Sequence, residues 1–191
     1  MQADERENIL YENGKRCAIN DEELYMMNLL GHPKKNKKKL LDIGCGSGEI
    51  SFALKERGFD PFGVDFSATA IKIATNAGLS CMHADLDKGI PLENESFDIT
   101  WAGDVMEHVF DPIGVFSDIH RVLKDEGEFY ATIPHDLHWK TRIKTLIGHS
   151  FQEGVYRKFN QFKHHSFFSE RLMRYMYEKS GLKIMNISYV I

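Results

Sequence analysis

Three glycines and three acids in the first half of the chain have the spacing of a nucleoside-binding site. The stretch LLDIGCGSGEIS runs from an apolar segment that contains Asp42 into Gly44, Gly46 and Gly48. Glycines between a strand and a helix let the backbone approach a ligand closely, beside the N–H groups of a helix start. A tight strand–helix turn would use the same residues, so the glycines alone do not identify a ligand.

Two further acids follow at the ends of the next two apolar segments. Asp65 comes about 20 residues after the glycines, where a carboxylate can accept hydrogen bonds from both ribose hydroxyls. Asp85 is followed by Leu86, which suits a polar contact to an adenine amino group beside an apolar wall for the ring. With the glycines, these acids predict a site for a ligand that contains adenosine.

A dinucleotide fits this pattern poorly. The dinucleotide fingerprint G-x-G-x-x-G requires a third glycine, and this chain has Glu49 and Ile50 after Gly48. Asp42, just before the loop, would repel a pyrophosphate. The same carboxylate suits a ligand with positive charge, such as a sulfonium or an amino group.

The composition is that of one ordinary globular domain, with 191 residues of which 42% are apolar and 27% charged. A net charge of −4 argues against wholesale nucleic-acid binding. No apolar run is long enough to span a membrane, and the first residues lack the apolar core of a signal peptide. Cys17, Cys45 and Cys81 have neither disulfide nor zinc spacing. We therefore expect a reduced, cytoplasmic protein with a single domain, residues 1–191.

Alternating strand and helix patterns position the candidate residues. Repeated β–α units imply an α/β fold with a doubly wound, mostly parallel sheet, in which ligands bind beyond the carboxyl ends of the strands. The expected strands are residues 40–44, 60–66, 79–85, 97–103, 128–134 and 182–191. The expected helices are residues 49–58, 67–78 with Ser67 as N-cap, 111–127 and 169–181 with Ser169 as N-cap.

Two further segments lie outside this rhythm. Residues 1–39 are expected to form a helical cap, with a helix that starts near Asp21 and ends at Gly31. Residues 135–168 form a long interruption before the last helix, and we expect them to be a lid over the substrate.

Taken in order and spacing, LLDIGCGSGEIS, FGVDFS, ADLD and FDITWAGDVMEHV, followed by RVLKDEGEFYATIP, resemble the motifs of the class I S-adenosylmethionine-dependent methyltransferases over roughly residues 40–134. The resemblance implies a Rossmann-like sheet of seven strands, of which this chain would lack the last, and S-adenosyl-L-methionine as cofactor. It implies that the glycine loop lies near the methionine moiety, Asp65 near the ribose and Asp85 near the adenine. The cofactor-contacting residues that it implies are Asp42, Gly44, Cys45, Gly46, Gly48, Asp65, Phe66, Ser67, Asp85, Leu86, Ala102 and Gly103.

The stretch GDVMEHVFDP carries the candidate catalytic residue. Asp104, Glu107 and His108 would share one face of a helical turn at the mouth of the methyl-donor site. We predict that His108 is a general base for a hydroxyl acceptor; a structural histidine under the lid is the alternative. With His165, these residues also match the metal-binding positions of the small-RNA 3′-terminal 2′-O-methyltransferases, although Asp104 replaces a glutamate. Because the Glu-His pair is widespread in methyltransferases that bind no metal, we predict no metal.

The acceptor is less constrained than the cofactor. Residues 135–168 combine positive charge with interleaved aromatic side chains, which suits an acidic small substrate, a weak membrane-surface contact through residues 139–148, or RNA. No separate RNA-binding module is visible, and HHSFFS and the Glu-His pair are similar to those of the ubiquinone-pathway O-methyltransferases. We therefore expect O-methylation of a small-molecule hydroxyl or carboxylate and no stable complex with nucleic acid. A non-catalytic partner subunit is disfavoured, because Asp42, Asp65 and Asp85 are all present.

Overall fold

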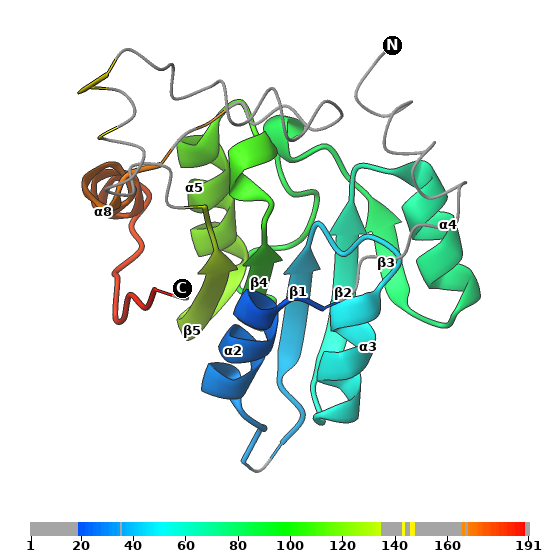
Figure 1. Ribbon diagram of the computed structural model, residues 1–191. Helices are drawn as coiled ribbons and strands as arrows, with labels where there is room; N and C mark the ends of the chain where they lie inside the picture. The colour runs from blue at the N-terminus through cyan, green and yellow to red at the C-terminus, as the bar shows by residue number, and fades with distance from the viewer. Residues whose placement is uncertain are drawn as a thin grey trace.

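Five parallel strands form the centre of the structure. The computed structural model describes residues 19–34, 36–134, 143, 146–147, 166 and 168–189. The sheet has the strand order β3-β2-β1-β4-β5, and every neighbouring pair runs in parallel (Figure 1). The strands are β1 (Lys39–Ile43), β2 (Asp60–Asp65), β3 (Ser80–His83), β4 (Phe97–Gly103) and β5 (Leu123–Thr132). The predicted doubly wound α/β fold is confirmed.

Helices cover both faces of the sheet. On one face, α2 and α3 pack on β1 and β4, and α4 packs beside α3; on the other face, α5 and α8 cover β4 and β5 (Figure 1). The helices are α2 (Asp21–Leu30), α3 (Glu49–Glu56), α4 (Ala68–Asn76), α5 (Pro112–Val122) and α8 (Glu170–Lys179), with the 3₁₀ turns η1 (Leu86–Lys88) and η2 (Met106–His108).

Side-chain caps start most of these helices where the sequence indicates. Ser67 Oγ accepts from the Ala70 N–H at the start of α4, and Ser169 Oγ accepts from the Leu172 N–H at the start of α8. Both predicted N-caps are therefore confirmed. Such caps satisfy backbone donors that have no partner within the helix, and each stabilises a helix by about 1 kcal/mol.

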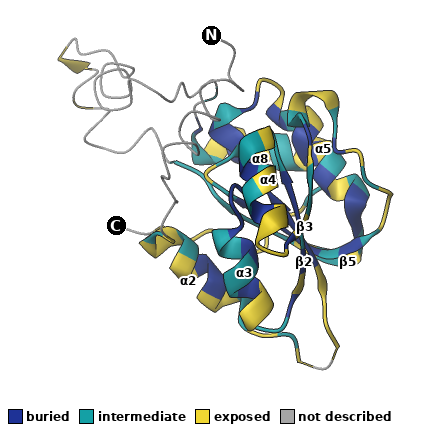
Figure 2. Ribbon diagram, turned by 90° about the vertical axis from the view of Figure 1, so that its right-hand side faces the viewer, coloured by how far each residue is buried: buried dark blue, intermediate teal, exposed yellow. Residues whose placement is uncertain are grey.

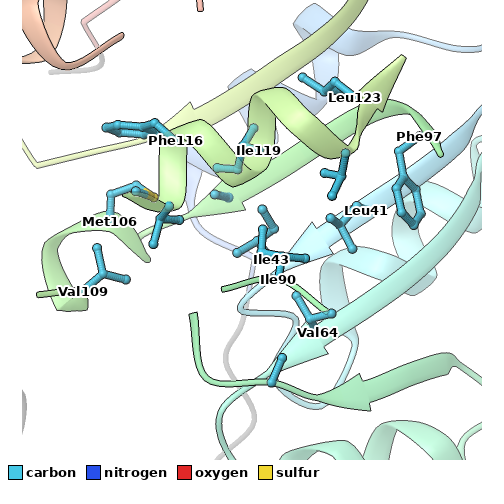
Figure 3. Close-up of a cluster of buried hydrophobic side chains, with 14 of the residues drawn as sticks. Leu41, Ile43, Val64, Ile90, Phe97, Met106, Val109, Phe116, Ile119 and Leu123 are labelled. Carbon is cyan, nitrogen blue, oxygen red and sulfur yellow. The ribbon is translucent and has the colours of Figure 1, made fainter. Parts of the chain in front are cut away.

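Apolar side chains fill the space on both faces of the sheet. Alternation along β1 places Leu41 and Ile43 on the α5 face, while Leu40 faces α2 and α3. Figure 3 shows Met106 and Phe116 beside this layer, so the turn after β4 is anchored in the core through Met106. The helices turn their buried sides to the sheet and their exposed sides outward (Figure 2). The site described below is therefore built on a rigid layer.

The predicted helix over 111–127 is wrong in its last five residues. Helix α5 ends at Val122, and Leu123 already pairs with Phe97 as the first residue of β5. The register then shifts, so that Ile99 pairs with Glu128, and Glu126 takes a left-handed φ of 60° within the irregularity. Pairing with β4 and burial of Leu123 outweigh the local helical preference of the polar residues that follow.

The predicted strand over 182–191 is also wrong for its described part. Residues 182–189 form no strand, and Met185 and Tyr189 are largely exposed. The segment is held through side chains, since the Tyr25 hydroxyl donates to Ser188 Oγ and the Tyr189 hydroxyl donates to Glu170. Its apolar residues suggested a strand, but a strand also needs a partner that completes its backbone hydrogen bonds.

The predicted cap and lid are only partly described. The helix expected near Asp21 is α2, and Gly31 ends it, as predicted. Residues 1–18 of the predicted cap lie outside the described residues, as does nearly all of the predicted lid, including most of the basic segment 139–148. No helix within the described ranges has the length and apolar character needed to cross a membrane.

Candidate active site

The candidate residues meet at the carboxyl ends of β1, β2 and β4. Strand β1 lies at the centre of the sheet, with β2 on one side and β4 on the other, and the following helices α3 and α5 cover opposite faces (Figure 1). In open α/β sheets the ligand crevice lies at this reversal of strand order, beyond the carboxyl end of the central strand.

The loop between β1 and α3 has a conformation that requires glycine. Gly44, Gly46 and Gly48 have φ values of 72°, 53° and 95°, a region that other residues rarely occupy. A Cβ on Gly44 would collide with the Val105 side chain, which follows β4. The Val105 side chain is thus packed directly against the first glycine, and a side chain at position 44 would not fit there.

The N–H groups of this loop point into the protein. The Gly44 and Cys45 N–H groups donate to the Val64 carbonyl at 2.8 and 3.0 Å, and the Gly46 N–H donates to Asp65 Oδ2 at 2.8 Å. The Gly48 N–H donates to the Cys45 carbonyl at 2.9 Å. A phosphate-binding loop directs such groups at its ligand, so these four N–H groups do not form a pyrophosphate cradle.

Asp42 lies below the loop, on the face covered by α3. Its carboxylate is 2% exposed and accepts a 2.6 Å hydrogen bond from the Ser51 hydroxyl. Burial raises the pKa of Asp42 to about 7, and the nearby Asp65, Glu23 and Glu49 carboxylates add to this rise, which the Ser51 hydrogen bond opposes. A cationic group in the crevice would therefore favour the ionised form of Asp42.

Asp65 connects the loop to the end of β2. Its Oδ1 accepts from the Ser67 N–H at 2.7 Å and its Oδ2 accepts from the Gly46 N–H at 2.8 Å. Burial raises the pKa of Asp65, while these two backbone bonds act in the opposite direction. Each carboxylate oxygen has a second lone pair, so the residue can support the loop and still accept bonds from a diol.

Glu23 of α2 and its N-cap Asn20 also reach this site, and neither is among the residues predicted from the sequence. Glu23 Oε1 lies 3.0 Å from the position of a Cβ on Gly103, and Asn20 Nδ2 donates to Asp104 Oδ2 at 3.3 Å. Burial raises the pKa of Glu23. The capping box of Asn20 and Glu23 holds both side chains in place. The sequence NDEE indicates the capping box, but it does not indicate that Glu23 lies next to Gly103.

The far side of the crevice carries the residues expected near the adenine. Asp85 caps η1, accepting from the Asp87 N–H at 3.2 Å, and forms a 2.9 Å ion pair with Lys88. Phe66 lies beside His83, with ring centroids 5.9 Å apart, and Leu86 packs at the edge of the main core. Ser67 is buried as the α4 cap, so its expected cofactor contact stays a prediction.

The turn after β4 differs from the predicted helical face. Asp104 precedes η2 with a left-handed φ of 50°, and its Oδ1 accepts from the Thr132 hydroxyl at 2.9 Å. Glu107 and His108 lie within η2, where Glu107 is buried and His108 is half-buried. The prediction of one helical turn for all three is therefore wrong, because Asp104 precedes η2 and binds Thr132 of β5, although the three residues line one groove. Ala102 is buried, so its expected contact with the cofactor stays a prediction.

An open groove begins at this turn. It has a volume of about 1910 Å³ and runs from Asp104, Glu107 and His108 along β5, between α2 and α8. The backbone of Ser166, just before α8, donates to the Glu107 carbonyl at 3.1 Å. Ser166 thus lies beside η2, and the groove leads to the candidate catalytic residue from the side away from Asp85.

The described residues offer no group of three His, Cys, Asp or Glu side chains arranged to hold a metal ion. His165, the fourth member of the alternative metal set, lies outside the described ranges.

Comparison with known proteins identifies the fold and its relatives. A protein family described as a methyltransferase domain matches residues 41–131. A ubiquinone biosynthesis O-methyltransferase from Pseudomonas syringae pv. tomato is 34% identical over 106 residues, which is 50% of this chain and 44% of that protein. A second one, from Pseudomonas fluorescens, is 32% identical over 58% of this chain and 50% of that protein. The chain thus spans about half the length of these relatives.

A solved structure shows the same architecture. An S-adenosylmethionine-dependent methyltransferase from Mesorhizobium loti superposes with a TM-score of 0.55 at 27% identity, covering 61% of this chain and 54% of that one.

Proposed function

We propose that this chain, which carries a class I S-adenosylmethionine-dependent methyltransferase domain, transfers a methyl group from S-adenosyl-L-methionine to a hydroxyl or carboxylate of a small molecule. The observation that carries the cofactor assignment is the direction of the loop amides. The N–H groups of Gly44, Cys45, Gly46 and Gly48 are satisfied inside the protein, and the carboxylates of Asp42 and Asp65 flank the loop. A backbone that can approach the ligand closely, with two carboxylates beside it, favours a cationic nucleoside over a pyrophosphate.

The residues of the crevice fit each part of this cofactor. We propose that Asp42 and Glu23 face its amino group, that Gly103 and the glycine loop contact its methionine chain through backbone, and that Asp65 accepts from the ribose hydroxyls. The left-handed glycines and the absence of a Cβ at Gly103 leave the space for close approach. Within the described part of the chain, the ion pairs of lysine and arginine do not include Asp42, Asp65 or Glu23, and the His83 imidazole is near enough to Asp65 to lower its pKa. A cationic ligand would therefore add opposite charge beside Asp42 and Glu23.

The same reasoning extends to the adenine end. Asp85 and Leu86 follow β3 at the next strand end, and Phe66 follows β2, so we propose that these three surround the ring. Cys45 and Ser67 complete the proposed cofactor set through their backbone, because the Cys45 side chain is buried toward Gly63 and the Ser67 hydroxyl caps α4.

The bound cofactor supplies an electrophilic methyl group on a sulfonium, so the protein has to position an acceptor in line, exclude water and accept a proton where the acceptor has one. Orientation of this kind can lower a barrier by about 7–11 kcal/mol. We propose that His108 takes the acceptor proton on its imidazole, since it lies at the turn after β4, where the groove along β5 begins. A general base at this point contributes about 10²–10⁴-fold to the rate.

A small-molecule acceptor is supported by the relatives and by the groove. The two relatives from Pseudomonas are named for O-methylation in ubiquinone biosynthesis. The groove that begins at His108 is lined by more acids than bases among the described residues: Glu22, Glu95, Glu126 and Glu128 are among its acids, and Arg121, Lys124 and Lys183 are its lysines and arginine. We therefore propose no stable nucleic-acid complex, a cytoplasmic location, and at most a weak membrane-surface contact through residues 139–148.

A turnover screen tests this function. The purified chain is incubated with S-adenosyl-L-methionine and matched panels of phenols, carboxylates, sugar nucleotides and short RNAs, and S-adenosylhomocysteine formation is measured. The proposal expects product with phenols or carboxylates and none with RNA. Turnover that is confined to RNA and abolished by a chelator would replace it with the metal-dependent alternative.

A further inference from the structure

One carboxylate holds the turn that carries Asp85 and Leu86 against the rest of the domain. Asp87 is the middle residue of η1. Its Oδ1 accepts hydrogen bonds from two backbone donors, the Phe110 N–H at 2.9 Å and the Asp111 N–H at 3.1 Å. Both donors belong to the segment that joins η2 to α5. A single oxygen therefore connects the proposed adenine side of the crevice with the segment that follows His108.

These two bonds are placed to fix a position. Phe110 and Asp111 precede the first turn of α5, so their N–H groups have no acceptor within that helix. Hydrogen bonds to an ionised acceptor are shorter and stronger than neutral ones. Within η1, Asp85 accepts from the Asp87 N–H and pairs with Lys88. The Asp85 carboxylate is consequently fixed relative to Asp87. The bonds that hold the Asp87 carboxylate therefore also set the position of Asp85.

A separate set of contacts holds the rest of this loop. Asp118 Oδ2 accepts from the Ile90 N–H at 2.8 Å, and the Arg121 guanidinium donates to the Ile90 and Leu92 carbonyls at 2.7 Å each. These bonds attach residues 90–92 to the middle of α5 without Asp87. Loss of the Asp87 carboxylate should therefore leave residues 90–92 bound to α5 and free only η1 from its contacts with the backbone of Phe110 and Asp111.

We propose that Asp87 is a positioning residue for the adenine pocket, which sets the selectivity of that pocket for a purine with a 6-amino group by holding η1 against the backbone of Phe110 and Asp111. The inference rests on the proposed function, because it uses Asp85 as the acceptor for that amino group. When η1 is held in place, the Asp85 carboxylate can accept a hydrogen bond from the 6-amino group, and it would repel a carbonyl oxygen at the same position. When η1 shifts, this discrimination between the two groups is lost, whereas the apolar contacts of the adenine ring are largely kept.

The test compares S-adenosylhomocysteine with S-inosylhomocysteine, which has a carbonyl in place of the 6-amino group and a proton on the adjacent N1, by calorimetric titration of the full chain. Wild type should prefer the adenosyl ligand by about tenfold or more, the value of one charge-assisted hydrogen bond. Asp87→Ala should reduce that preference to about threefold or less, mainly by weakening the adenosyl ligand. Asp87→Asn keeps an acceptor oxygen for the two N–H groups and should keep the preference. Glu93→Ala removes an exposed carboxylate from the same loop and is the matched control.

Four outcomes would overturn the inference. If Asp87→Ala lowers both affinities equally and keeps the wild-type preference, Asp87 only supports the fold. If Asp87→Asn loses the preference as fully as Asp87→Ala, the backbone bonds are not the cause. If wild type binds neither ligand, the proposed function fails and the inference fails with it. Should Asp87→Ala not fold at the assay temperature, Asp87→Glu displaces the acceptor by one methylene, and an unchanged preference in that variant would also overturn the proposal.

Discussion

Replacing Asp65 with alanine should separate the cofactor-binding role of this carboxylate from its structural one. The side chain accepts the Gly46 and Ser67 N–H groups at 2.8 and 2.7 Å, and we propose that its remaining lone pairs accept both ribose hydroxyls. Two charge-assisted bonds to a ligand are worth about 1.5–3 kcal/mol each. Their loss corresponds to a rise of about 10²–10⁴-fold in the dissociation constant of S-adenosylhomocysteine.

The same substitution leaves two backbone donors without their acceptor. An unsatisfied donor costs about 1–3 kcal/mol when it is buried, so the variant should also unfold at a lower temperature. Asp60→Ala is the matched control, since Asp60 is exposed at the opposite end of the same strand. It should change neither quantity.

Calorimetric titration measures the affinity, and thermal unfolding in the absence of ligand measures the structural effect. The two readouts must be compared at a temperature at which Asp65→Ala is folded. A folded Asp65→Ala variant whose affinity stays within about threefold of wild type would refute the role of this carboxylate in ribose binding.

Further predictions concern four other residues. Burial raises the pKa of Asp42 to about 7, so binding of an amine should require deprotonation of Asp42. The affinity for S-adenosylhomocysteine should therefore fall by up to about tenfold per pH unit below pH 7 and level off above pH 7. Equal affinities at pH 6 and pH 8 in calorimetric titrations would contradict this prediction. Glu23→Gln should weaken the same ligand about tenfold by removing a charge beside Gly103, whereas Glu22→Gln, on the neighbouring exposed position, should not. Gly63→Ala would place a Cβ 2.5 Å from Cys45 Sγ and should lower the free energy of unfolding by about 1–3 kcal/mol, measured by urea denaturation; an unchanged midpoint would show that the loop adjusts freely. With an acceptor from the screen, His108→Gln should lower turnover about 10²–10⁴-fold at nearly unchanged cofactor affinity, and a small loss would indicate a structural histidine.

The parts of the fold that could be predicted from the sequence are those set by local chemistry. Glycines with left-handed φ values, the serine caps of α4 and α8, and strands that end in Asp65 or Gly103 all leave a signal within a few residues. The class of the fold follows from their order, because alternating β–α units close only as a parallel sheet.

The errors arise where distant contacts decide. Leu123 leaves α5 because Phe97 offers it a backbone ladder, and Asp104 leaves η2 because Thr132 and Asn20 bind its carboxylate. These partners are far away in the sequence, so a local sequence pattern cannot indicate the contacts. Residues 182–189 have apolar side chains suited to a strand, yet pairing depends on a neighbouring strand that the segment itself does not supply.

The candidate site shows the same division. Asp42, Asp65 and Asp85 could be named because each lies within or at the end of a predicted strand, and the structure brings the first two together around the glycine loop. Glu23 and Asp87 could not, since their roles depend on Gly103 and on the backbone of Phe110, which are far from them in sequence.

The most direct test of the central claim is a titration of the wild-type chain with S-adenosyl-L-methionine, S-adenosylhomocysteine and NAD⁺ under identical conditions. The inward direction of the loop amides and the acids beside them predict saturable one-site binding of the first two ligands and no measurable binding of the third. Binding of NAD⁺ at a similar or higher affinity, or no binding of either adenosyl ligand, would contradict the account.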